Sequence, residues 1–229
     1  GRRGAPPHDD TSVQGRWHFA RYTSNIAVPL NVSGWGSIDF DGRGAGTFEE
    51  SNNQEGATFG PINPLFTYEV FDDGRIGLLL GPGNLLVGSI VEGGQVMLAA
   101  GSNVPGEPPS MYVFVREAAG MSDADFAGDY QMLGFGHESG TNAYWSITAG
   151  TIADGAGTNS FIGMRNEDGT TTTTGFDGVF SAISPNGLVT FTNGGGDTYL
   201  GAISQDASVV VGAGTTNAGG EPAIFLFLK

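Results

Sequence analysis

The chain of 229 residues contains no cysteine, which excludes a disulfide scaffold, a cysteine-ligated zinc site and a thiol nucleophile. Only 9 Lys and Arg residues stand against 24 Asp and Glu, and the formal charge of −15 opposes binding to nucleic acids and anionic membranes. No apolar run approaches the roughly 20 residues of a membrane-spanning helix. The hydrophobic fraction is 39% and the charged fraction 14%, as in a folded chain rather than a disordered acidic tail. We therefore expect a folded protein without a nucleic-acid partner.

Residues 1–12 show no apolar periodicity and predict a flexible leader before the folded part. The body is acidic, free of cysteine and rich in Gly, Thr and Asn. Together these features favour the mature part of a bacterial exported protein or lipoprotein, located outside the cytoplasm in the periplasm or on the cell surface.

An internal repeat organises the sequence. A shift of 113 residues aligns the two halves without a gap, and about 20 of the 104 aligned positions are identical. The constant phase predicts two copies of one unit, at 13–116 and 126–229, joined by a linker at 117–125.

Within a unit, short runs of β-branched, aromatic and aliphatic residues alternate with turn dipeptides, and no stretch has a helical period. In the first copy this pattern predicts eight strands, at 15–23, 34–41, 44–51, 66–72, 75–80, 85–92, 95–101 and 111–116. The dipeptides Asp41-Gly42, Asp73-Gly74 and Asp206-Ala207 suit tight hairpin turns, because their residues tolerate positive φ.

The connections predict the architecture. Those after the second, fourth and sixth strands are tight, whereas those after the first, third and seventh span about 10, 14 and 9 residues. In an up-and-down meander the tight turns then gather at one end and the long loops at the other. An eight-stranded meander can close into a barrel, which removes its edges. The sequence thus predicts an all-β fold of two tandem antiparallel barrels related by duplication.

The start of each unit resembles the lipocalin and avidin-like barrels, whose first strand often opens with Gly-x-Trp. Here the motif is Gly15-Arg16-Trp17, with Gly128-Asp129-Tyr130 in the second copy. The resemblance implies that Arg116, at the end of the last strand, packs over Trp17, with Lys229 in the matching place beside Tyr130.

Aromatic residues near the long-loop end are the candidate ligand contacts, since flat rings beside amides can stack on a sugar or a small apolar molecule. The alternative is that they cap the barrel mouth as part of the core. The candidate residues are Trp35, Asn53, Phe59, His137, Glu138, Tyr144, Trp145 and Asn166.

Motifs for catalysis are scarce. His137-Glu138 could pair a general base with its orienting group, but a solvated loop pair is the simpler interpretation. Asp39 to Gly44 resembles the start of a calcium loop yet lacks the later carboxylates, and a plain turn explains it. We expect no metal and no cofactor.

The last two strands of each unit are apolar on both faces, at Val96–Leu98 and Met111–Val115 and again at Val209–Val211 and Ile224–Leu228. Something must cover their outer faces. We expect the two barrels to pack on each other through these strands.

Three functions remain open. The first is non-enzymatic binding of a small apolar molecule or glycan at the long-loop end. The second is a surface interaction protein with solid barrels and a cell-surface partner, and the third is a barrel enzyme. A cavity above about 300 Å³ favours the first or third, and interiors filled by Phe and Tyr favour the second.

Overall fold

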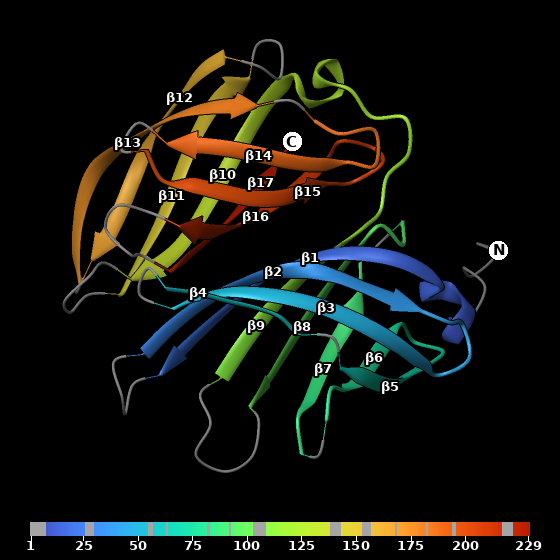
Figure 1. The fold of residues 1–229 in the computed structure, drawn as a ribbon. Helices are drawn as coiled ribbons and strands as arrows, with labels where there is room; N and C mark the ends of the chain where they lie inside the picture. Colours follow the sequence, from blue (N-terminus) through green and yellow to red (C-terminus); the bar gives the residue numbers. More distant parts are fainter. Residues whose placement is uncertain are drawn as a thin grey trace, which may run out of the picture.

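The computed structural model describes residues 8–25, 30–54, 57–62, 64–81, 83–91, 93–102, 109–137, 143–152, 157–167, 169–181, 183–193, 196–216 and 222–229. The described part is built almost entirely of antiparallel strands, arranged in two sheets that follow one another along the chain (Figure 1). Its helices are two short 3-10 turns, η1 (Asp10–Val13) and η2 (Asp123–Phe126), each placed just before the first strand of a sheet. Among the described residues, no helix has the length and apolar character needed to cross a membrane.

The first sheet has nine strands. They are β1 (Gly15–Asn25), β2 (Leu30–Phe40), β3 (Ala45–Gln54), β4 (Ala57–Ile62), β5 (Leu65–Val70), β6 (Arg75–Leu79), β7 (Leu85–Ile90), β8 (Val96–Ser102) and β9 (Pro109–Arg116). β1 pairs with both β2 and β9, and β2 also pairs with β3. On its other side, β3 pairs with β5 along its first residues and with β4 along its last. The pairing therefore runs around eight strands and returns to β1, with β4 as an added strand.

The second sheet is a closed eight-stranded antiparallel barrel. Its strands are β10 (Gly128–His137), β11 (Ala143–Ile152), β12 (Gly157–Glu167), β13 (Thr170–Ser181), β14 (Leu188–Asn193), β15 (Thr198–Ile203), β16 (Val209–Thr216) and β17 (Ala223–Leu228). The prediction of an all-β chain with a closed eight-stranded antiparallel barrel is confirmed.

Two predicted loops are strands instead. In the first copy, the predicted connection between 51 and 66 contains β4, which pairs with the end of β3. In the second copy, only residues 168 and 169 separate β12 from β13, and the run Thr170–Thr174 lies in β13. β-branched threonine fits a pleated strand well, so this hairpin extends through the positions that match the long connection of the first copy at the 113-residue shift.

The tight turns are built as the dipeptides predict. Gly42 and Gly74 have φ values of 76° and 83°. Ala207 has φ 56° and is the one non-glycine residue with positive φ in the described part of the chain. The Oγ of Ser204 accepts from the amides of Ser208 and Val209, at 3.1 and 3.0 Å, and these bonds hold the turn around Ala207.

Each sheet encloses its own apolar core, and the two sheets pack against each other through a separate apolar cluster. This cluster consists of Ala20, Val113, Val115, Val211, Ala213 and Ile224. β1, β2 and β9 of the first sheet face β15, β16 and β17 of the second (Figure 1). The Ser33 hydroxyl also donates to the carbonyl of Gly214 across the contact, at 2.9 Å.

The predicted contact is correct for β9, β16 and β17, whereas β8 takes part only through its first residue, Val96, which packs against the cluster. Leu98 on the outer face of β8 is 45% exposed. Its place in the contact is taken by β1 and β2, which lie on the other side of β9 in the sheet.

Candidate functional site

A cleft between the two sheets is the candidate site, and its floor is the outer face of β1, β2 and β3. Phe19 points into the first core, so its neighbour His18 points outward by the alternation of a strand. His18 lies opposite Ser37, and Ser37 lies opposite Glu49. One polar row thus crosses three strands. Trp35, opposite Ser51, forms the next row.

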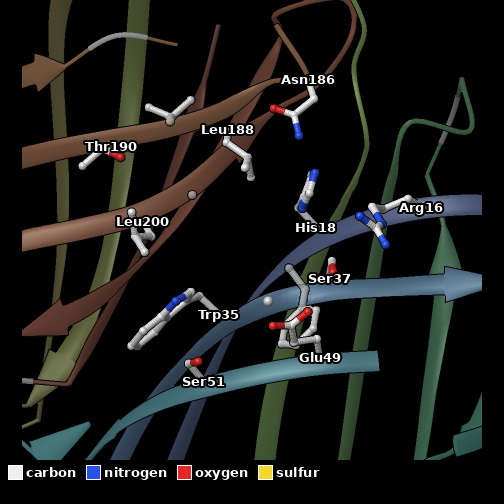
Figure 2. Close-up of a pocket in the computed structure, with 14 residues that line it drawn as sticks. Arg16, His18, Trp35, Ser37, Glu49, Ser51, Asn186, Leu188, Thr190 and Leu200 are labelled. Atoms are coloured by element: carbon white, nitrogen blue, oxygen red, sulfur yellow. The ribbon is translucent and has the colours of Figure 1, made fainter. Parts of the chain in front are cut away.

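The roof of the cleft comes from the second barrel. Leu188 and Thr190 project from β14 and Leu200 from β15, while Asn186 stands in the turn before β14. Figure 2 shows Trp35 and His18 on one side of the hollow and Leu188 and Leu200 on the other. The hollow measures about 360 Å³, which is large enough for a small molecule.

His18 occupies a buried position in this cleft, with 7% of its surface exposed. Its Nε2 lies 3.7 Å from Oε1 of Glu117, the first residue after β9. The side-chain amide of Asn186 donates to the same oxygen at 3.3 Å. Burial lowers the pKa of His18 and outweighs the opposing effect of Glu117, so the imidazole is neutral at pH 7.

The positive charge at the cleft is already paired. Arg16 forms a forked contact with Asp39, with Nη2 to Oδ2 at 2.8 Å and Nε to both oxygens at 3.1 Å. The pKa of this guanidinium is raised, first by its hydrogen bonds and charge interaction with Asp39 and then by the charges of Glu117 and Glu49. Glu49 is exposed and makes no ion pair with a described residue. The cleft is therefore rich in negative charge and in hydrogen-bond acceptors.

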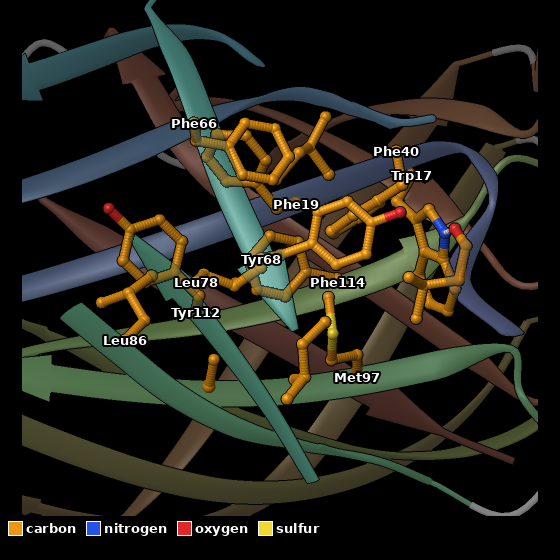
Figure 3. Packing of buried hydrophobic residues seen from close by; sticks show 14 of the residues in the cluster. Trp17, Phe19, Phe40, Phe66, Tyr68, Leu78, Leu86, Met97, Tyr112 and Phe114 are labelled. Atoms are coloured by element: carbon orange, nitrogen blue, oxygen red, sulfur yellow. Dashed lines mark hydrogen bonds between the residues drawn. The ribbon is translucent and has the colours of Figure 1, made fainter. Parts of the chain in front are cut away.

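Among the described residues, the interiors of the two sheets offer less space than the cleft. The first is filled by aromatic and aliphatic side chains that include Trp17, Phe19, Phe40 and Tyr68 (Figure 3). In the second barrel a hollow of about 170 Å³ remains. The residues that line it include Tyr144, Thr148, Arg165, Asp197, Tyr199 and Phe225.

The predicted ligand contacts do not gather at one place. Trp35 lines the cleft, and Tyr144 lines the interior hollow of the second barrel with Arg165 3.9 Å from its ring centroid. Trp145 is 40% exposed on β11.

The remaining predicted contacts lie in strands or outside the described residues. Asn53 is fully buried in β3, and the amide of Asn166 donates to the Thr171 hydroxyl at 2.9 Å. The backbones of Phe59 and His137 belong to β4 and β10. Glu138 lies outside the described residues.

The residues implied by the barrel resemblance lie at one end of each sheet. The guanidinium carbon of Arg116 is 4.6 Å from the ring centroid of Trp17, and Nζ of Lys229 is 5.6 Å from that of Tyr130. The indole of Trp17 also donates to the Val13 carbonyl at 2.8 Å.

Of the residues that line the cleft, Trp35 was predicted as a ligand contact, whereas the polar group of His18 with its partners Glu117 and Asn186 was not. One signal was available, because a histidine between core positions on a strand must point outward. The partners of His18 follow only from the packing of the two sheets, since Asn186 lies far along the chain.

This chain is not assigned to a known family by its similarity to other proteins. No family model matches the chain, and no curated protein matches it. Kievitone hydratase from Nectria haematococca superposes with a TM-score of 0.30 at 7% identity, covering 100% of this chain and 94% of its own. A protein of unknown function from the DUF3598 family of Nostoc punctiforme gives 0.27 at 9% identity, covering 96% and 97%.

Transferrin binding protein B from serogroup B Neisseria meningitidis gives a TM-score of 0.29 at 12% identity, covering 86% of this chain and 52% of its own. At TM-scores this low, none of these likenesses carries an argument about the chain's function.

Proposed function

We propose that this chain is a non-enzymatic binding protein that holds a small molecule in the cleft between its two sheets. The observation that carries the proposal is the hollow of about 360 Å³, bounded by Trp35, Leu188 and Leu200 and ending on buried His18. Small-molecule sites favour such junctions, with apolar walls and a few fixed polar groups. A titratable group whose pKa is shifted by burial supports a functional role.

Intrinsic fluorescence tests this proposal, because the three tryptophans lie in different surroundings. Trp35 lines the cleft, Trp17 is fully buried in the first core and Trp145 is exposed on β11. A library of small apolar molecules, glycans and lipids should contain compounds that quench or shift Trp35. Trp35→Phe should abolish the signal, whereas Trp145→Phe should preserve it.

Affinity measurements on cleft variants complete the test. Trp35→Ala and Leu200→Ala should each weaken binding of any such compound by about tenfold, through loss of apolar contact. A compound that binds equally well to both variants would place the ligand elsewhere and overturn the proposal.

The interior of the second barrel is a second candidate, closer to the long-loop site that the sequence predicts. Thr148 is 2% exposed, lines the hollow of about 170 Å³, and its Oγ1 has no hydrogen-bond partner among the described residues. An unsatisfied buried hydroxyl is costly, so a small polar ligand there would gain from it. Thr148→Val should then weaken that ligand's binding, whereas exposed Thr170→Val should not.

We also propose that the two sheets arose by tandem duplication, as the 113-residue repeat of the sequence predicts. Hydrogen bonds that recur at the 113-residue shift support this. The amide of Val70 donates to Asp10 Oδ1, and the amide of Ile183 donates to Asp123 Oδ1. Backbone bonds recur in the same way: His8 to Asp72 and Met121 to Pro185, Ile90 to Gly74 and Ile203 to Gly187, Arg116 to Gln95 and Lys229 to Ser208.

These equivalences extend the repeat to residues that the sequence assigns to a leader and a linker. Residues 8–12 and 121–125 make matching bonds around η1 and η2. We therefore place the start of each unit at residues 8 and 121. The location outside the cytoplasm and the cell-surface partner stay predictions, supported by the acidic, cysteine-free composition.

A further inference from the structure

We propose that the ligand of the cleft is a protonated organic amine with a flat apolar body. This inference rests on the proposed function, and it adds the chemical class of the ligand. In this arrangement the body lies against Trp35, Leu188 and Leu200, and the ammonium group lies over the row His18, Ser37 and Glu49.

The charges around that row favour a cation. Arg16 is the one guanidinium among the residues that line the described cleft. Three carboxylates interact with its charge, those of Asp39, Glu49 and Glu117. Arg16 is held in a forked contact by Asp39 and has its charge matched there. Carboxylates that have no positive partner would repel an anionic ligand, whereas a cationic ligand would neutralise their excess negative charge. The net charge of −15 also draws cations toward the protein.

The side chains of the row supply hydrogen-bond acceptors. Nε2 of neutral His18 faces the Glu117 carboxylate, which favours the tautomer protonated at Nε2 and leaves Nδ1 as an acceptor. Glu49 only accepts when ionised, and the Ser37 hydroxyl can accept as well. The Asn186 amide uses one of its two N–H donors on Glu117, so acceptors outnumber the donors left at the row. An ammonium group has three donors and no acceptor, and this matches the row.

An apolar wall stands beside the row. Trp35 and Ser37 are two residues apart on β2, so both side chains lie on the same face of the strand. The indole presents an apolar surface that also attracts cations through its π-system. Leu188 and Leu200 cover the opposite side. A ring joined to an amine by a short chain would reach both the wall and the row.

Three probes of matched shape test the charge preference: phenethylamine, its neutral N-acetyl amide, and 3-phenylpropionate. Each is titrated into the full chain, and binding is followed by backbone NMR shifts of β2 and β14. We expect the amine to bind about tenfold more tightly than the amide, with the carboxylate weakest. The preference for the amine should shrink as salt is added.

Two isosteric variants then separate the local carboxylate from the charge of the whole protein. Glu49→Gln should reduce amine affinity to that of the amide and leave amide affinity unchanged. Glu69→Gln removes the same charge from an exposed position of β5, outside the cleft, and should leave the tenfold preference nearly intact. Equal affinity for amine and amide would overturn the amine class, and an amine preference that survives Glu49→Gln would overturn the placement of the ammonium group over this row.

The outcome for Trp35→Ala distinguishes this failure from failure of the proposed function. If all three probes weaken in Trp35→Ala but show no preference for the amine, the cleft binds ligands of another class. If no probe shifts the cleft strands, or if Trp35→Ala changes no affinity, both proposals are overturned.

Discussion

At one end of each sheet, a single cationic side chain packs over an aromatic ring of the first strand, and Arg116 makes the most contacts. Its guanidinium lies over Trp17 and donates to three backbone carbonyls, those of Ser12, Gln14 and Gly94. These interactions tie η1, the start of β1 and the turn before β8 to the end of β9. Arg116 therefore holds the chain segments around the first core together.

Replacing Arg116 should destabilise the protein according to how many of its hydrogen bonds the new side chain can still form. Arg116→Lys keeps the cation over the ring but cannot reach all three carbonyls, and we expect a loss of about 2 kcal/mol in the free energy of unfolding. Arg116→Met should cost about 4 kcal/mol, because the carbonyls lose every charged donor. Urea unfolding measures both. The same changes at exposed Arg43 should cost less than about 0.5 kcal/mol, and equal losses at the two sites would contradict this account.

His18 should make stability depend on pH. Its pKa in the folded chain is lowered by burial, whereas the unfolded chain takes up the proton near pH 6.5. Below about pH 6.5 the unfolded state therefore binds more protons, and the free energy of unfolding falls until the pH passes the folded pKa. His18→Gln should lose less stability between pH 7.5 and 5.5 than the wild type does. Urea unfolding curves that shift equally in both proteins would contradict the prediction.

At the scale of elements, cross-strand spacing shapes the floor of the cleft through Gly36. A Cβ at Gly36 would lie 1.8 Å from the Glu49 carbonyl oxygen, which belongs to the backbone of β3. No side-chain rearrangement can relieve a contact with backbone. β2 and β3 can therefore approach at this point only because residue 36 has no side chain.

Gly36→Ala should separate β2 from β3 and destabilise the chain by about 3 kcal/mol or more. The matched control is Gly77→Ala in β6, where an added Cβ meets nothing within 4 Å. That change should be neutral or stabilise by up to about 1 kcal/mol, since it reduces the freedom of the unfolded chain. Thermal unfolding of the two variants gives the comparison, and similar melting temperatures would refute the steric argument.

Most elements were predictable because their signals are local. Alternation and turn dipeptides fix β1, β3 and β5 to β9 within a few residues, and Asp206-Ala207 is a turn as predicted. β4 could not be predicted, because Gly60 and Pro61 interrupt its alternating pattern and the strand forms only by pairing with β3. The cleft was not predictable either. Trp35 was identified as a ligand contact, but its partners Leu188 and Leu200 join it only through packing of the two sheets.

At the scale of the whole molecule, the contact between the sheets decides whether the cleft exists. Val113 and Val115 on β9 meet Val211 and Ala213 on β16 in a buried cluster that belongs to neither barrel core. This cluster holds the floor and the roof of the cleft in place. Loss of the contact should therefore remove the ligand site without emptying either core.

Val113→Asp should test this, because it places a carboxylate at a position that is 2% exposed. An unpaired buried charge costs about 3 kcal/mol or more, and most of that cost falls on the contact between the sheets. Calorimetry should show a single unfolding transition splitting into two, with loss of cleft binding. Val87→Asp, on the exposed outer face of β7, should change neither, and a wild-type profile for Val113→Asp would contradict the proposed role.

Side chains such as Ser37, Ser51, Leu188 and Leu200 border the cleft yet take no part in the clusters that fill the barrels. Recognition and folding thus draw on largely separate sets of positions, although Phe19 and Val189 line the cleft and also belong to the two cores. A few substitutions at the outward-facing positions should therefore change which ligand binds, while both cores and the fold stay the same.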